Sequence, residues 1–278
     1  MPRRRGSPSI AFALGLVALA FSATPARAQV TPIVVVPETK PAPPPADTPA
    51  FSSDATWRFA ASVGGTKTSG NSKSSTVNLS GEAVRTTDNS KLNLAIRGLY
   101  AEANDNRTGA NIAFSSQYDR DFSRDWFGFG KLDLMRDHPA NIDMRQSAYG
   151  GVGYHLVRTP DHSWDLSGGV GYTEDQYVRP ANVAGALREE YGRVEGVISE
   201  SSTHKVTETT SLRQKVGYFP NLKESGAFRM VFDAGLSVAI NASLSLTAGW
   251  TYRYDSDPGV GIKKGDAVYV TGIGIKWD

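Results

Sequence analysis

The side chains that could carry out nucleophilic or acid–base chemistry in this chain of 278 residues are few. It has no cysteine, which excludes disulfides, thiol catalysis and zinc–thiolate sites. A hydrolase of the lipase or protease kind needs a serine and a histidine within hydrogen-bond reach of each other. The four histidines are His138, His155, His162 and His204. Only His138, with Asp137 and Asp143 nearby, is expected in an outer loop where a protease-like Asp–His pair could form, and most loop histidines are simply solvated.

Metal and cofactor chemistry has equally little support. Residues 255–266 carry oxygen ligands at spacings loosely like those of a calcium loop, but the sixth position is Val260 rather than glycine and Pro258 stiffens the turn. A solvated acidic loop is the better interpretation, and there is no phosphate-binding glycine motif. We therefore predict no catalytic, metal-binding or cofactor-binding residue, no cofactor and no enzyme activity. A surface hydrolase of phospholipase or protease type is the alternative.

The last thirteen residues, 266–278, show which element dominates the chain. Side chains alternate along this segment, so that one face is apolar and carries Tyr269, Ile273 and Trp277. Successive side chains of a strand project to opposite faces, and this strand is long enough for the ~9–11 residues that cross a bilayer at a tilt. Because hydrocarbon tolerates no open sheet edge, similar strands have to close into a barrel.

The remainder of the chain after residue 56 repeats this pattern. Alternating segments separated by turn residues are the signature of an outer-membrane barrel, and bacterial single-chain barrels have an even number of strands. We predict an all-β fold, a transmembrane antiparallel β-barrel of about 12 strands over residues 57–278. The predicted strands are 57–67, 74–86, 90–102, 109–121, 125–137, 144–157, 162–174, 188–201, 205–218, 226–240, 243–255 and 266–278.

The connections fall into two classes if the N-terminus lies in the periplasm. Short turns inside and long loops outside are typical of this class of barrel. The short periplasmic connections are 86–89, 121–125, 159–161, 201–204 and 241–242. The mostly longer outer connections are 105–108, 139–143, 175–187, 220–225 and 256–265, with a short first one at 68–73.

Aromatic residues form two expected girdles at the membrane interfaces. Those at the periplasmic ends are Trp57, Tyr118, Trp126, Tyr154, Trp164 and Trp277. Those at the outer ends are Tyr100, Tyr172, Tyr218, Phe228, Tyr252, Tyr254 and Tyr269. Small and aliphatic residues are expected to face lipid between them: Ala61, Val63, Leu94, Ile96, Ile112, Leu132, Leu134, Val152, Val170, Phe232, Ala234, Leu236, Leu246, Ala248 and Ile273.

The opposite strand face is charged and must line the lumen, because each Arg or Lys on lipid would cost ~2–4 kcal/mol near the midplane. Both signs are interleaved, so facing pairs can neutralise one another across a narrow barrel. These residues are Glu82, Lys91, Arg97, Asp119, Lys131, Asp133, Arg145, His155, Asp165, Arg193, Glu195, Arg213, Lys215, Arg229, Asp233, Arg253 and Lys276. Bridging side chains predict small or absent conductance, with a mild preference for anions.

The N-terminal region predicts export. Residues 1–28 contain an Arg run, an apolar stretch and the small-residue site Ala26-Arg27-Ala28, which together indicate a cleaved signal peptide. Cleavage would remove four of the 30 Lys and Arg and none of the 28 Asp and Glu, leaving 26 against 28 and a net charge of −2. A nucleic-acid partner therefore loses its support. Residues 29–56 are Pro-rich, which favours a disordered periplasmic linker.

Several short motifs add a family resemblance. Trp57 opens the first strand, Gly70-Asn71-Ser72 follows it, Tyr118-Asp119 closes the fourth, and Gly150-Gly151-Val152-Gly153-Tyr154 lies in the sixth. With the signal peptide, these features resemble the family of salt-induced outer-membrane proteins, a domain of unknown function in Gram-negative bacteria. The resemblance implies a location and a fold but no established activity. Members generally end on an aromatic residue, whereas here Trp277 is followed by Asp278.

The sequence thus predicts an outer-membrane β-barrel of the Gram-negative envelope, structural or stress-related, with at most a narrow pore. Its expected partners are outer-membrane lipid, lipopolysaccharide and the barrel assembly machinery. A soluble secreted β-sandwich binding protein is a further alternative to the hydrolase. The sequence pattern does not indicate an oligomeric state.

Overall fold

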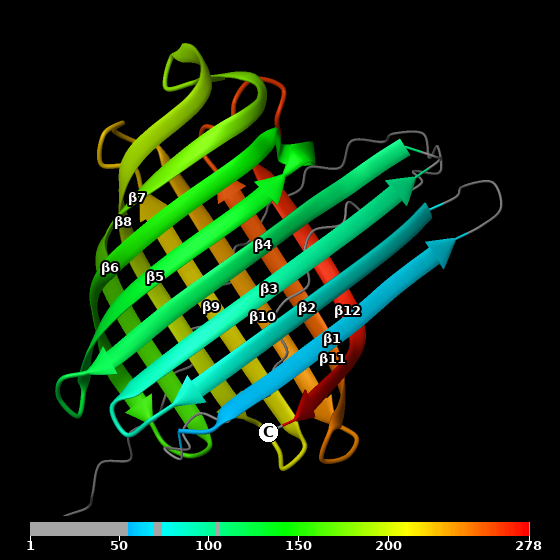
Figure 1. The fold of residues 1–278 in the computed structure, drawn as a ribbon, viewed down its shortest axis with the longest axis vertical. Helices are drawn as coiled ribbons and strands as arrows, with labels where there is room; N and C mark the ends of the chain where they lie inside the picture. Colours follow the sequence, from blue (N-terminus) through cyan, green and yellow to red (C-terminus); the bar gives the residue numbers. More distant parts are fainter. Residues whose placement is uncertain (1–54, 69–73, 104–105, 278) are drawn as a thin grey trace, which may run out of the picture. The chain divides into compact units, whose positions relative to one another are not determined.

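The computed structural model describes residues 55–68, 74–103 and 106–277, and they form one closed barrel of twelve antiparallel strands (Figure 1). Each strand pairs with its neighbour in sequence, and β12 pairs with β1. The all-β barrel fold is therefore confirmed. The strands are β1 (Trp57–Thr68), β2 (Ser74–Thr86), β3 (Ser90–Ala103), β4 (Asn106–Asp121), β5 (Trp126–Asp137), β6 (Ile142–Arg158), β7 (His162–Val183), β8 (Ala186–Lys205), β9 (Thr210–Pro220), β10 (Phe228–Ala239), β11 (Leu244–Asp255) and β12 (Gly265–Trp277), with a 3₁₀ turn at His138–Ala140.

Alternation along the strands sorts side chains to the two faces of the wall. On β5, for example, Leu132 and Leu134 are exposed on the outside, while Lys131 and Asp133 point inward and bind each other. The exterior is apolar along most strands, with Val63, Ile112 and others more than half exposed. A soluble β-sandwich would bury such residues between two sheets, and a closed barrel instead turns them outward.

The aromatic residues gather near the strand ends, as predicted. Near the ends that carry the short turns, Trp57, Phe59 and Trp277 stack across β1 and β12. At the opposite ends, the rings of Tyr218, Phe228 and Tyr254 stack across β9, β10 and β11. Tyr252 lies beside this second group on β11.

Inward-facing aromatic rings lie against glycines of the neighbouring strand. Phe127 and Phe129 on β5 cover Gly153 and Gly151 on β6, and a β-carbon on either glycine would come within 3.0 Å of the ring. A side chain at these positions would collide with a ring or with backbone, so glycine is required there. The glycines of the β6 motif therefore leave room on the inner face for the rings of Phe127 and Phe129.

Strands β7 and β8 are longer than the sequence pattern indicated. The predicted outer loop at 175–187 is wrong, because both strands continue to a two-residue turn at Ala184-Gly185, where both residues have positive φ. This is the backbone that a tight hairpin needs, and glycine takes it without strain. The predicted turn at 201–204 is also wrong, since β8 runs on to Lys205 and the turn follows at residues 206–209.

The β7–β8 hairpin projects beyond the other strands in Figure 1 and contacts the β11–β12 loop, residues 256–264. The backbone N–H of Ala184 donates to Asp257 Oδ2 at 2.9 Å. Ala181, Val183 and Tyr191 form a buried apolar cluster in the hairpin. The hairpin and this loop together form a roof at one end of the lumen.

None of the helical segments in the described ranges is long and apolar enough to cross a membrane. The predicted signal peptide, most of the predicted linker and the first outer connection fall at residues 1–54 and 69–73, outside the described residues.

Candidate functional site

The lumen holds a cavity of about 300 Å³, lined by inward-facing residues of the strands and by residues of the roof. Its wall carries ten of the charged residues that the alternation assigned to the lumen, which confirms their inward direction. They are Arg97, Lys131, Asp133, Arg145, Arg193, Glu195, Lys215, Arg229, Asp233 and Arg253.

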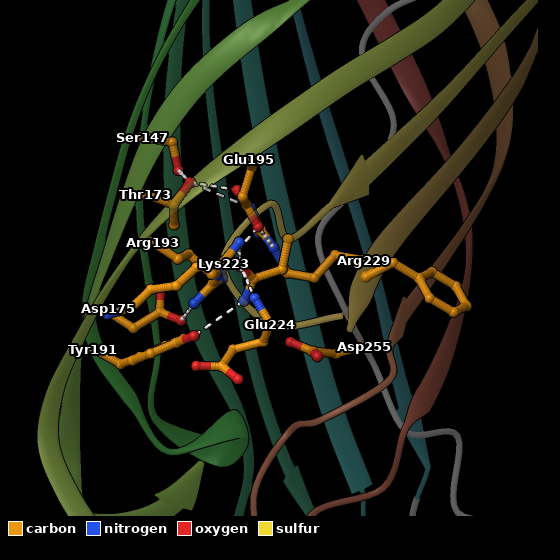
Figure 2. A network of polar contacts seen from close by, with 12 residues as sticks. Ser147, Thr173, Asp175, Tyr191, Arg193, Glu195, Lys223, Glu224, Arg229 and Asp255 are labelled. Carbon is orange, nitrogen blue, oxygen red and sulfur yellow. Dashed lines mark hydrogen bonds and ion pairs between the residues drawn. The ribbon is translucent and has the colours of Figure 1, made fainter. Parts of the chain in front are cut away.

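Glu195 on β8 is the centre of a hydrogen-bond network on the lumen wall (Figure 2). Its side chain is 1% exposed, and its Oε1 accepts from Arg193 Nε at 2.9 Å and from Arg229 Nε at 3.0 Å. Its Oε2 accepts from Arg229 Nη2 at 2.5 Å, Thr173 Oγ1 at 2.6 Å and Tyr149 OH at 2.8 Å. Both oxygens are therefore fully used, and this carboxylate is committed to holding two arginines.

Asp175 on β7 is the second carboxylate of this network, which the sequence analysis had assigned to an outer loop. It binds Arg145 through two contacts, one of them 2.7 Å long, and accepts from Arg193 Nη1 at 2.8 Å. Arg193 thus bridges Asp175 and Glu195. The alternation that places Thr173 on the inner face would have included Asp175 if the predicted strand 162–174 had been extended by one residue.

Arginines from the consecutive strands β9, β10 and β11 contact other strands, two of them across the lumen and the one on β10 along the wall. Arg213 on β9 lies 3.4 Å from Glu82 on β2, and Arg229 on β10 reaches β8 at Glu195. Arg253 on β11 contacts Met135 Sδ on β5 at 3.4 Å. Arg213 and Arg253 thus span the interior, as predicted, and restrict its width.

Two further cations in the cavity are unpaired. In the described part of the chain, Arg97 on β3 and Lys215 on β9 have neither an ion pair nor a hydrogen bond, and Arg97 Nε is buried without a partner. Lys131 is bound to Asp133 at 2.6 Å, and Asp233 accepts from Thr251 at 2.7 Å. The alternation predicts that Arg97 and Lys215 face the lumen but does not distinguish them from the paired cations.

The four histidines contact acidic residues or each other. His138 Nε2 lies 3.4 Å from Asp143 Oδ1, so the expected Asp–His pair is present in the β5–β6 connection. His155 is inward-facing as predicted and binds Asp165 at 2.7 Å and Asp121 at 3.2 Å. The other two are His162 and His204, whose Nδ1 atoms are 3.3 Å apart on β7 and β8. His204 was expected in a turn and instead lies within β8.

The acidic segment between β11 and β12 uses its carboxylates within the protein. Asp255 Oδ1 accepts from the backbone N–H of Asp257 at 3.0 Å, and Asp257 holds the hairpin through Ala184. Across residues 55–68, 74–103 and 106–277, no group of three or more His, Cys, Asp and Glu could hold a metal ion. The loop thus connects the roof to the strands.

Comparisons with known proteins give one family and several barrels of similar architecture. The model of a family described as "Protein of unknown function, DUF481" matches residues 61–277. No curated protein matches the sequence. An outer-membrane channel from Pseudomonas putida F1 is similar with a TM-score of 0.46 and 12% identity, over 84% of this chain and 99% of that one.

Two other solved structures extend this comparison. The NanC porin has a TM-score of 0.42 and 10% identity, over 78% of this chain and 97% of its own. The translocator domain of the autotransporter NalP from Neisseria meningitidis has a TM-score of 0.40 and 13% identity, over 80% of this chain and 88% of that one. At this level of similarity these proteins carry no information about what the chain does.

Proposed function

The chain belongs to the family described as protein of unknown function, DUF481, and from that premise we propose that it is an outer-membrane β-barrel with a narrow channel through a charged lumen. The proposal has two parts, the location and the channel. Each is supported by a separate feature of the barrel.

The exterior of the wall supports the location. It carries exposed aliphatic residues between two groups of aromatic residues, which suits a hydrocarbon layer bounded by two interfaces. In this location the barrel contacts outer-membrane lipid and lipopolysaccharide. A signal peptide cut after residue 28 and the barrel assembly machinery would bring it there. A role in envelope stress follows from the resemblance to salt-induced proteins and belongs to the same proposal.

One observation supports the channel, namely the cavity inside a lumen that is crossed by Arg213 from β9 and Arg253 from β11. Barrels of ~8 strands are filled by side chains, and those of ~16–18 strands hold an open aqueous channel. Twelve strands with bridging arginines lie between these cases. The unpaired cations Arg97 and Lys215 favour anions in the remaining space.

Planar-bilayer recording of the purified barrel tests the channel. We expect small or rare steps with a mild anion preference. Arg213→Ser removes the bridge to Glu82, so it should raise the conductance and lower the anion preference, because a negative charge is left without its partner. Lys205→Ser, at an exposed end of β8, is the matched control and should change neither. Large, stable, cation-selective steps from the unaltered protein would contradict the proposal.

A further inference from the structure

Arg97 and Lys215 lie on opposite walls of the lumen. In a ring of twelve strands, β3 and β9 are six positions apart, so their inward side chains face each other across the interior. Both line the same cavity, and the charge of Arg97 acts on Lys215. We propose that these two residues form a binding site for a small oxyanion, a compound with carboxylate or phosphate groups.

The charge of this region supports an anionic ligand. Around Lys215 and Arg253 the basic side chains are Arg97, Lys131, Arg145, Lys215 and Arg253, and the acidic ones are Asp119, Asp133, Asp137 and Asp233. Two of those carboxylates already have donors, since Asp133 is held by Lys131 and Asp233 by Thr251. Cations taken out of bulk water without a counterion are costly, so an anion bound between Arg97 and Lys215 would stabilise the barrel.

The other basic residues of the lumen serve as the internal comparison. Arg145, Arg193 and Arg229 each bind Asp175 or Glu195, and Arg213 binds Glu82. Arg253 contacts Met135 Sδ and has no carboxylate partner in the described residues, but each of these four arginines has one. A ligand would have to displace an existing ion pair to bind them, whereas Arg97 and Lys215 offer free donors.

The shape of the space restricts the ligand. On β9, Arg213 lies two residues from Lys215 and binds Glu82 across the lumen, and on the cavity wall Arg229 binds Glu195. A cavity of about 300 Å³ is at the lower end of the ~300–1,000 Å³ typical of ligand sites, so the ligand is small. The guanidinium of Arg97 suits a planar carboxylate or a phosphate bidentately, and the ammonium of Lys215 suits a second oxygen.

This inference rests on the proposed barrel in the outer membrane but not on its conducting ions. Binding without conductance would therefore refute the channel alone, and conductance without binding would refute the site alone. Binding is measured on the full mature chain refolded in detergent micelles, after heat-dependent gel mobility has shown that each variant is closed.

Isothermal titration calorimetry with inorganic phosphate and with succinate, in chloride buffer, tests the site. We expect saturable binding of at least one probe with one site per barrel. The probe that binds more tightly shows whether the site prefers a phosphate or a carboxylate. Arg97→Gln and Lys215→Gln should each weaken binding about tenfold or more, the effect of losing one charge-assisted hydrogen bond. Lys276→Gln is the matched control, because this lysine also faces the lumen but lies outside the cavity wall, and it should leave affinity unchanged.

Thermal unfolding gives a second readout on the unaltered protein, should a variant fail to close. The stronger probe should raise the midpoint of unfolding of the unaltered barrel, since a ligand that binds only the folded state stabilises it. Absence of saturable binding and of any such shift would overturn the site. Equal weakening by Lys276→Gln would also overturn it, because the anion would then respond to the overall charge of the lumen.

Discussion

Glu195 shows how much of the lumen's order depends on a single residue. It is buried, it accepts five hydrogen bonds, and it holds arginines from both β8 and β10. A buried carboxylate of this kind does little for stability when it is compared with an apolar core, but its removal leaves Arg229 without its carboxylate partner and Arg193 with Asp175 alone. The contribution of Glu195 to the stability of the barrel is therefore seen when the residue is replaced.

We expect Glu195→Gln to lower the free energy of unfolding by about 3–5 kcal/mol, because Arg193 and Arg229 lose their shared counterion. Urea unfolding in lipid vesicles, followed by tryptophan fluorescence, measures this loss. Glu190→Gln on the exposed part of the same strand should change stability by no more than about 0.5 kcal/mol. Similar losses in the two variants would show that the network is not coupled to folding.

The lumen residues could be predicted from alternation alone, but their partners could not. The pattern places Arg145, Arg193, Glu195 and Arg229 on the inner face, as the structure does. Which carboxylate each arginine reaches depends on the offset between strands that are not neighbours in sequence, such as β8 and β10. That offset is set by the closure of the whole ring and leaves no trace in the residues of one strand.

At the scale of the strands, β7 and β8 are the longest elements, and they are also the ones whose length the sequence pattern underestimates most. The pairing of β7 with β8 is interrupted between Gln176 and Ala181, where Pro180 cannot donate to the ladder. There the side chain of Asn141 binds the backbone of Arg179 in place of a strand partner. The alternation is broken at this point, so the pattern ended there, although both strands continue beyond it.

Gly151 on β6 lies too close to the backbone of β7 to carry a side chain. A β-carbon there would lie 2.2 Å from the carbonyl oxygen of Gly168 and 2.6 Å from the Cα of Gly169, which are backbone atoms of β7 and cannot move aside. We expect Gly151→Ala to destabilise the barrel by about 1–3 kcal/mol through overpacking. Heat-dependent gel mobility compares the temperatures at which the variants open.

Gly130 on β5 is the matched control for this substitution. A β-carbon at that position meets no atom within 4 Å, so Gly130→Ala should be neutral or should stabilise by about 0.4–1 kcal/mol. Equal opening temperatures for both alanine variants would show that the close approach of β6 and β7 is not required.

At the scale of the whole molecule, the barrel has two unlike ends. One end carries short turns such as residues 159–161, and the other carries the roof made by the β7–β8 hairpin and the β11–β12 loop. Outer-membrane barrels place short turns in the periplasm and long connections outside. The roof is therefore expected at the cell surface.

An epitope tag inserted after Gly185, at the tip of the hairpin, tests this orientation. We expect antibody to reach it on intact cells, because Gly185 projects beyond the strands and a β-carbon there would meet no neighbouring atom. A tag between Pro160 and Asp161 should be reached only after the outer membrane is permeabilised. The opposite labelling would mean that the barrel is inverted.

The pairing of β1 with β12, which closes the ring, bears on the lifetime of the closed barrel. Strands β1 and β2 are paired over twelve residues, but in the described part of the chain the register between β1 and β12 covers five, from Phe59 with Trp277 to Val63 with Ile273. Among the neighbouring strand pairs this is the shortest register in the described residues, so we expect the ring to open at this join. The lifetime of the closed barrel would then depend on the pairing of β1 with β12 more than on the average strength of the wall.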